Sequence, residues 1–70
     1  MPLNRCPLGQ EVTIQDCVTD PMLRRRLNTM GILPGVRVTP LRATHGNLVL
    51  RVYDGRLAID AKLAAQIQAV

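Results

Sequence analysis

The sequence predicts a mainly β domain, a small five-stranded barrel with one short helix, on three observations. Short stretches of alternating apolar and polar residues recur along the chain, with turn signals between them at close spacing. The length of 70 residues permits one domain. No linker, repeat or low-complexity tract divides the sequence. We therefore expect a single domain over residues 1–70.

The helix is expected over residues 20–30, where start and stop signals frame an apolar stripe. Asp20 is a good N-cap, and Pro21 stands at the first helical position, where its missing N–H costs nothing. Gly31 can adopt the left-handed conformation that ends a helix. The stripe follows the spacing i, i+4 and i+7 and consists of Leu23, Leu27 and Met30.

One strand is predicted on each side of this helix. Residues 11–18 alternate apolar with polar side chains. After the helix, Pro34 and Gly35 supply a tight reversal, and residues 36–43 alternate again. Pro40 lacks the N–H that a ladder needs, which favours an edge strand or a bulge at this position.

The C-terminal half predicts two hairpins and a closing strand. A turn is expected over residues 44–47 and the strongest strand over residues 48–53. Asp54 and Gly55 form a two-residue hairpin signal that returns the chain through residues 56–59. The remaining elements are a helical turn over residues 61–65, capped by Asp60, and a strand over residues 67–70.

Five antiparallel strands with short hairpins leave two sheet edges, which a partly closed barrel protects best. We therefore expect an SH3-like barrel, with the helix between the first two strands plugging one end and a short helical turn before the last strand. An edge that stays unpaired also makes a homo-oligomer plausible.

Charge and composition limit the function. Nine basic residues against five acidic ones give a net charge of +4, which favours an acidic protein surface, nucleic acid or anionic lipid headgroups. Tyr53 is the single aromatic residue. One ring cannot build a base-stacking platform or a groove for proline-rich peptides. A purely electrostatic contact with nucleic acid is therefore kept as the alternative function.

Catalysis, metal binding and membrane insertion have no support in the sequence. One histidine, two thiols and five scattered acids match no catalytic arrangement, no phosphate-binding Gly-rich motif is present, and no small-molecule substrate is expected. Cys6, Cys17 and His45, with Asp16 beside Cys17, match no metal-ligand spacing, so we expect no metal site and no cofactor. No stretch approaches the about 18 apolar residues of a membrane span, and a cytoplasmic protein is expected.

Several motifs resemble the FeoA family, the small cytosolic component of bacterial ferrous iron transport. The run Met30-Gly31-Ile32-Leu33-Pro34-Gly35-Val36 is similar to the most recognisable segment of that family. Pro7-Leu8-Gly9 looks like its entry loop, Arg26-Leu27 like its helix signature and Arg56-Leu57-Ala58-Ile59 like its final hairpin. Thr44-His45-Gly46-Asn47 departs from the Leu-Gly-Asp-Pro turn that is common in the family.

The resemblance implies a non-enzymatic accessory protein that docks on the cytoplasmic part of FeoB, a membrane transporter with a GTPase domain, and modulates Fe²⁺ transport. Any effect of iron would then be indirect, through the partner, and the chain would lie at the inner face of the membrane only through that partner. A similar barrel is appended to iron-dependent transcriptional repressors. A regulatory domain of that kind is the alternative implied by the resemblance.

We expect the helix and its turn to form the partner surface, because they combine apolar and cationic groups on a short, ordered segment. At about 100° per residue Arg25 lies opposite the apolar stripe, with Arg24 on one flank. Arg26 lies closer to the stripe, with its stem along the barrel. A merely solvated helix face is the alternative. The predicted partner-binding residues are Met22, Arg24, Arg25, Asn28, Thr29 and Leu33, and the structural signature is Arg26, Leu27, Gly31, Pro34 and Gly35.

Overall fold

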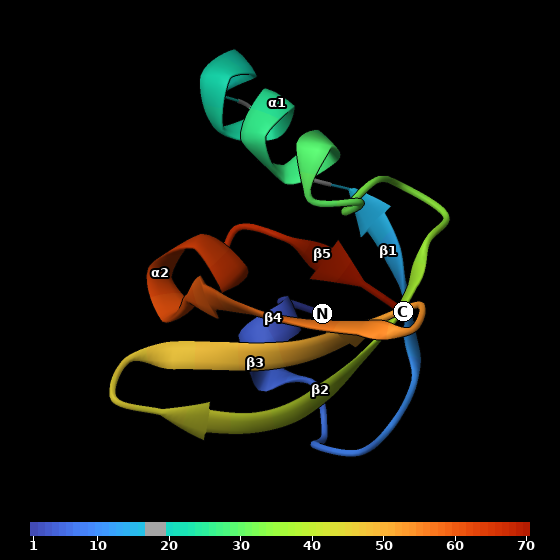
Figure 1. Cartoon of the computed structure of the whole chain (residues 1–70), viewed down its shortest axis with the longest axis vertical. Coiled ribbons are helices and arrows are strands. Elements are labelled where there is room, and N and C mark those ends of the chain that lie inside the picture. Colours follow the sequence, from blue (N-terminus) through green and yellow to red (C-terminus); the bar gives the residue numbers. More distant parts are fainter. Residues whose placement is uncertain (17–19) are drawn as a thin grey trace.

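The computed structural model describes residues 1–16 and 20–70 and shows a mostly β domain (Figure 1). Five antiparallel strands form one sheet in the order β4-β3-β2-β1-β5, which confirms the predicted small SH3-like fold. The sheet is not closed, since β4 and β5 are its two edges. In chain order the elements are the 3-10 helix η1 (Leu3–Arg5), β1 (Val12–Asp16), α1 (Pro21–Thr29), β2 (Arg37–Thr44), β3 (Asn47–Val52), β4 (Gly55–Asp60), α2 (Ala61–Ala64) and β5 (Gln68–Ala69).

Several strand boundaries differ from the prediction by one residue, and one predicted strand end lies outside the described residues. Tyr53 was expected to end a strand, but it lies in the turn between β3 and β4 with φ of 54°. Gly55 was expected in that turn and instead begins β4, where it pairs with Val52. The closing strand is shorter than predicted. The predicted strand over residues 11–18 begins at Val12, and residues 17 and 18 belong to the part that the structure does not describe.

Pro40 lies in a β-bulge, which is one of the two positions predicted for it. The register between β2 and β3 shifts between Pro40 and Arg42. The other setting, an edge strand, is wrong because β2 lies between β1 and β3. β1 pairs with β2 only at Arg37 and Val38, so the missing N–H of Pro40 removes no bond from that ladder. The Pro40 carbonyl accepts a hydrogen bond from the N–H of Gly9 at 2.6 Å.

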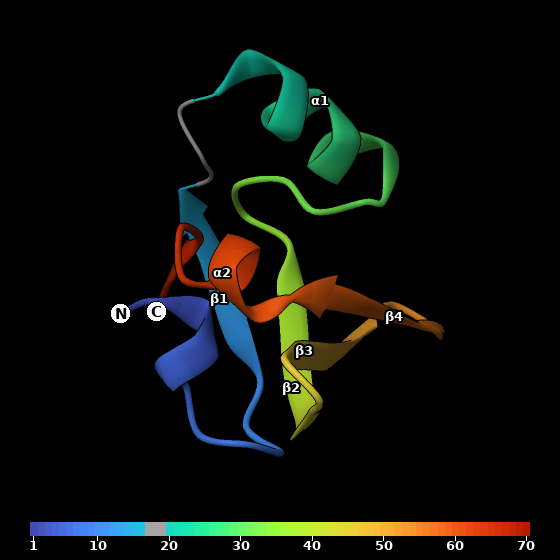
Figure 2. The same cartoon turned by 90° about the vertical axis from the view of Figure 1, so that its left-hand side faces the viewer.

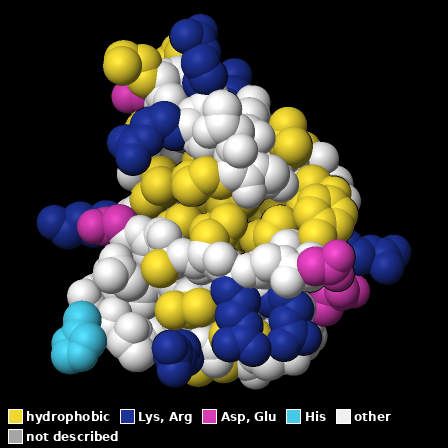
Figure 3. Space-filling model, viewed as in Figure 1, with side chains coloured by type: hydrophobic (Ala, Val, Ile, Leu, Met, Phe, Trp, Pro, Cys, Tyr) yellow, Lys and Arg dark blue, Asp and Glu magenta, His cyan; other side chains and the backbone are white. Residues whose placement is uncertain are grey.

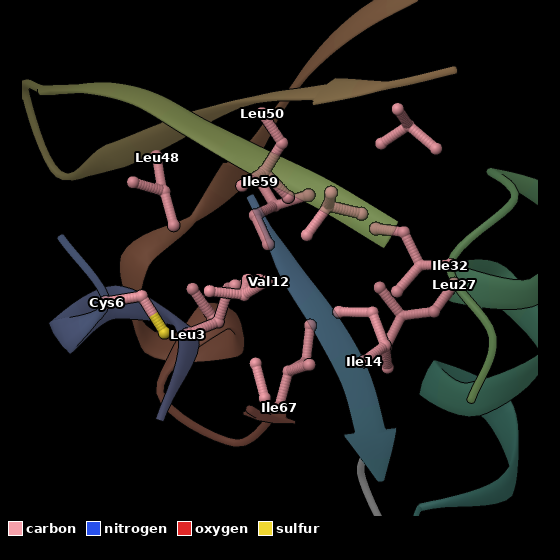
Figure 4. Packing of buried hydrophobic residues seen from close by; sticks show 14 residues of the cluster. Leu3, Cys6, Val12, Ile14, Leu27, Ile32, Leu48, Leu50, Ile59 and Ile67 are labelled. Carbon is pink, nitrogen blue, oxygen red and sulfur yellow. The ribbon is translucent and has the colours of Figure 1, made fainter. Parts of the chain in front are cut away.

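The hydrophobic core lies between the inner face of the sheet and the helices η1 and α2. Leu48, Leu50 and Val52 alternate along β3 and point into it. η1 was not predicted, and it contributes the fully buried Leu3, whose N–H donates to the carbonyl of Ile67 at 2.8 Å. Figure 4 shows these side chains converging on β1. The core is thus completed by segments from both ends of the chain.

The end of α1 is fixed by a pair of backbone hydrogen bonds around Gly31, which has the predicted left-handed φ of +86°. The N–H of Gly31 donates to the carbonyl of Asn28 at 3.1 Å, and the N–H of Ile32 donates to the carbonyl of Leu27 at 2.9 Å. This pattern is a Schellman motif, in which the residues of the longer bond also touch through their side chains. Leu27 and Ile32 are both fully buried beside Ile14 of β1 (Figure 4).

The reversal after α1 is tied directly to the sheet. The N–H of Val36 donates to the carbonyl of Leu33 at 3.1 Å, with Gly35 at φ +91°, which is a turn of the type that proline and glycine favour. The N–H of Gly35 then donates to the carbonyl of Ile14 at 2.7 Å, and the N–H of Ile14 donates to the carbonyl of Val36 at 2.8 Å. This turn therefore holds the exit of α1 against β1.

Replacing Gly31 by alanine is expected to lower the free energy of unfolding by about 1–2 kcal/mol, because a Cβ disfavours left-handed backbone. A clash is not the cause, since the added Cβ would meet only Val52 Cγ1 at an ordinary 3.8 Å. Gly31→Asn should cost clearly less than Gly31→Ala, because asparagine tolerates this conformation. Urea unfolding followed by circular dichroism measures both values. An alanine variant as stable as the parent, or an asparagine variant that is equally damaged, would contradict this explanation.

Candidate functional site

Helix α1 lies at one end of the longest axis of the molecule, beyond the sheet in both views (Figures 1 and 2). Asp20 is its N-cap, as predicted, and Asp20 Oδ1 accepts a hydrogen bond from the N–H of Met22 at 2.9 Å. Leu27 is the buried residue of the helix, and Leu23 is half-buried. The rest of α1 therefore presents a continuous exposed surface that begins at a fixed cap and ends at a fixed turn.

All six predicted partner-binding residues are exposed on this helix and turn. Met22 is 76% exposed and Leu33 is 40% exposed, so both apolar side chains are available at the surface. When the Asn28 amide is assigned with its nitrogen facing the carbonyl oxygens of Arg24 and Ile32, it donates to both at 3.2 Å, which gives Asn28 a part in closing the helix. We call this set the helix–turn surface: Met22, Arg24, Arg25, Asn28, Thr29 and Leu33.

A shallow hollow of about 270 Å³ lies on the outer side of α1. It is lined by Met22, Arg25, Arg26 and Thr29. The hydroxyl of Thr29 donates to the carbonyl of Arg26 at 2.6 Å, which leaves its methyl group and the arginine stems to form an apolar wall. Arg26 was predicted to be structural, and its place in this wall was missed because helical periodicity alone does not give the direction of a long side chain.

A second hollow, of about 310 Å³, separates α1 from the edge of the sheet. Figure 3 shows apolar side chains between the helix and the sheet in this part of the molecule. The predicted plug is therefore partial: α1 covers its end of the sheet through Leu27 and leaves an apolar groove beside it. The lining residues are Leu23, Arg26, Met30, Ala58, Ile59, Asp60, Leu63 and Gln66.

The candidate metal ligands named from the sequence do not come together in the described residues. Cys6 is buried, with its Sγ atom 3.6 Å from the carbonyl oxygen of Pro2. His45 lies in an exposed turn with φ of 49°. Cys17 belongs to the part that is not described. Within residues 1–16 and 20–70, no group of three or more His, Cys, Asp or Glu side chains is placed to hold a metal ion, and no helix is long and apolar enough to cross a membrane.

Three solved structures illustrate the fold that this chain shares. An iron uptake regulatory protein (FeoA) superposes with a TM-score of 0.87 at 22% identity, covering 100% of this chain and 97% of that chain. A FeoA protein from Chlorobium tepidum gives a TM-score of 0.89 at 21% identity, covering 99% and 68%. A manganese-dependent transcriptional repressor gives 0.85 at 22% identity, covering 100% of this chain and 40% of that chain. At these identities the likeness shows the fold alone.

The sequence comparisons identify the family of this chain. No curated protein matches the chain in sequence. A family model described as the FeoA domain, however, matches residues 1–70, which include the helix, the turn and all five strands. This chain therefore belongs to the FeoA family.

Proposed function

We propose that this protein is a non-enzymatic accessory protein of bacterial ferrous iron uptake that docks on the cytoplasmic region of a FeoB-type transporter and modulates Fe²⁺ transport. Membership of the FeoA family supports a role in ferrous iron transport. The docking partner is a membrane transporter with a GTPase domain, so the protein acts in the cytoplasm at the inner face of the membrane.

The observation that carries the docking proposal is the helix–turn surface itself. It offers an exposed apolar anchor, Met22, beside the cationic Arg24 and Arg25. Interfaces combine such apolar centres with charged surroundings, and methionine and arginine are enriched in them. An acidic patch on the transporter would complement this surface and direct the orientation of the complex.

The surface is also ordered before it binds, which lowers the entropy cost of association. The cap at Asp20, the Schellman motif at Gly31 and the turn at Gly35 fix both ends of the segment. Leu33 lies inside the reversal between the two glycines and is exposed next to the helix. A partner therefore meets a rigid ridge of helix and turn rather than a loop that must fold on contact.

Iron enters this proposal as the cargo of the transporter. The described residues bring no set of metal ligands together, so the influence of this protein on Fe²⁺ movement is assigned to contact with the transporter. An accessory role of this kind needs neither a catalytic group nor a bound cofactor in the chain.

The function is tested by measuring initial rates of Fe²⁺ uptake in cells. Deletion of the gene is expected to lower the rate severalfold, and a plasmid that encodes the parent protein should restore it. The Arg24→Glu/Arg25→Glu variant should accumulate to the same level and fail to restore uptake, because it reverses the charge of the helix–turn surface. Uptake that is unaffected by the deletion would exclude the transport role. Full rescue by the variant would exclude this surface.

A further inference from the structure

A second basic surface lies on the outer face of the sheet and is built from residues other than those of the helix–turn surface. Arg51 of β3 and Arg56 of β4 are direct cross-strand partners, and both are exposed. Arg42 of β2 is paired with Val49, two residues from Arg51 on β3, so the three arginines come from three adjacent strands. Figure 3 shows a group of Lys and Arg side chains over β2 and β3, at the end of the long axis opposite α1. We call Arg42, Arg51 and Arg56 the arginine face.

The register of the sheet requires these side chains to share one side. Leu48, Leu50 and Val52 of β3 point into the core, so Val49 and Arg51 point outward. Directly opposed residues of antiparallel strands lie on the same face, which places Arg42 and Arg56 with them. A hollow of about 450 Å³ lies between Arg42 and Arg56, with aliphatic Val49 and Ala58 on its floor.

Repulsion within the arginine face destabilises the folded protein, and a bound anion would relieve that repulsion. Like charges that are directly opposed across a ladder are destabilising, and Arg51 and Arg56 are such a pair. Within residues 1–16 and 20–70 no ion pair involves the three arginines, and Glu11 lies instead 3.9 Å from Arg37. Asp60, on the same strand as Arg56, is held as the N-cap of α2 by the N–H of Lys62 at 2.6 Å. The guanidinium groups are therefore free to bind external anions.

We propose that the arginine face binds the anionic phospholipid surface of the membrane. Guanidinium groups pair with phosphate in two parallel hydrogen bonds, and basic side chains near an anionic bilayer are attracted over about one Debye length. The floor between the arginines is aliphatic, whereas single-stranded nucleic acid is bound on stacked aromatic rings. Three adjacent strands present the charges on a sheet surface, which suits contact with a planar array of headgroups.

Lipid binding by the arginine face would also assist docking on the transporter. This step of the inference rests on the proposed function. α1 lies beyond the sheet at one end of the longest axis, whereas the arginine face lies on the outer side of β2, β3 and β4. With this side of the sheet on the bilayer, the helix–turn surface, which is built from other residues, would remain available to the cytoplasmic domains of the transporter. Lipid binding would raise the local concentration of the protein near its membrane-embedded partner.

Vesicle co-sedimentation tests the lipid contact without any transporter present. The parent protein is expected to sediment with vesicles of equimolar phosphatidylcholine and phosphatidylglycerol, and not with pure phosphatidylcholine. Each arginine near such a surface is worth about fivefold in partitioning, so Arg51→Glu/Arg56→Glu should lower the partition coefficient by about 25-fold or more. Arg5→Glu/Lys62→Glu is the matched control: it changes the net charge equally, on exposed residues of η1 and α2, and should retain far more binding.

A milder variant separates loss of binding from loss of fold. Arg51→Gln/Arg56→Gln removes the repulsion between the paired arginines, so it should unfold at the same or a higher urea concentration than the parent while binding anionic vesicles more weakly. Equal binding to both kinds of vesicle, or equal loss in the η1/α2 control, would overturn the assignment. Binding to duplex DNA that depends on Arg51 and Arg56, without vesicle binding, would overturn it in favour of nucleic acid. Failure of transporter docking would leave all these vesicle results unchanged.

Discussion

Replacing Leu27 by alanine is expected to lower the free energy of unfolding by about 3 kcal/mol, within the range for fully buried leucines. Leu27 is 0% exposed, and it is the buried residue through which α1 joins the core. Its partners Ile14 and Ile32 belong to β1 and to the Schellman motif (Figure 4). A small domain has only a few kcal/mol of net stability, so this single truncation should leave it close to unfolding.

Urea unfolding followed by circular dichroism measures this loss, with two truncations on the same segment as controls. Met22→Ala and Leu33→Ala remove comparable apolar groups from exposed positions and should change the free energy of unfolding by less than about 0.5 kcal/mol. A Leu27→Ala variant that is as stable as these controls would show that α1 is not held through this side chain.

The same reasoning limits how Leu27 variants are interpreted in binding experiments. Loss of the Leu27 side chain releases α1 from β1, so the helix–turn surface loses its ordered geometry even though Leu27 itself is buried. Partner binding should then fall together with stability. Such a result would therefore not place Leu27 in an interface, and only exposed residues of α1 can map one.

Charge reversal on the helix–turn surface is expected to raise the Kd for the cytoplasmic region of the transporter by about tenfold or more, which corresponds to about 1.4 kcal/mol. Arg24→Glu/Arg25→Glu turns attraction to an acidic patch into repulsion. The fold should survive, because both positions are exposed and acidic residues near a helix N-terminus are compatible with its dipole. Circular dichroism of the variant checks this point.

The control variant for this prediction has the same net charge as the helix variant, but its substitutions lie elsewhere on the molecule. Arg5→Glu/Lys62→Glu lowers the net charge as much as the helix variant, but on η1 and α2. It should leave the affinity for the transporter fragment within about threefold of the parent, since long-range attraction alone is screened beyond about 8 Å at physiological salt. Equal loss in both variants would mean that the overall charge, and not the helix–turn surface, governs docking.

Local signals in the sequence are sufficient to predict α1 and the turn that follows it. The cap at Asp20, the left-handed Gly31 and the reversal at Gly35 each depend on a few neighbouring residues, and the structure confirms all three. The Asp54-Gly55 signal predicts the β3–β4 turn one residue too late, because Val52 pairs with Gly55 and the turn consists of Tyr53 and Asp54. The register of the two whole strands decides that turn, and it puts Tyr53 at positive φ.

Features built from distant segments could not be predicted in this way. η1 is joined to the rest of the fold by the hydrogen bond from the N–H of Leu3 to the carbonyl of Ile67, near the other end of the chain. The groove beside α1 needs Leu23 and Leu63, which only the folded chain brings together. The arginine face likewise depends on the registers of β2, β3 and β4, whereas the sequence drew attention to the consecutive arginines of α1.

The central claim is that this FeoA-family protein docks on its transporter through the helix–turn surface. Calorimetric titration of the purified protein into the soluble cytoplasmic region of the FeoB-type transporter from the same organism tests it most directly, with and without guanine nucleotide. Saturable binding in at least one nucleotide state, weakened about tenfold or more by Arg24→Glu/Arg25→Glu and preserved in the η1/α2 control, is the predicted result. No heat of binding in any nucleotide state, or full affinity in the charge-reversed variant, would contradict the account.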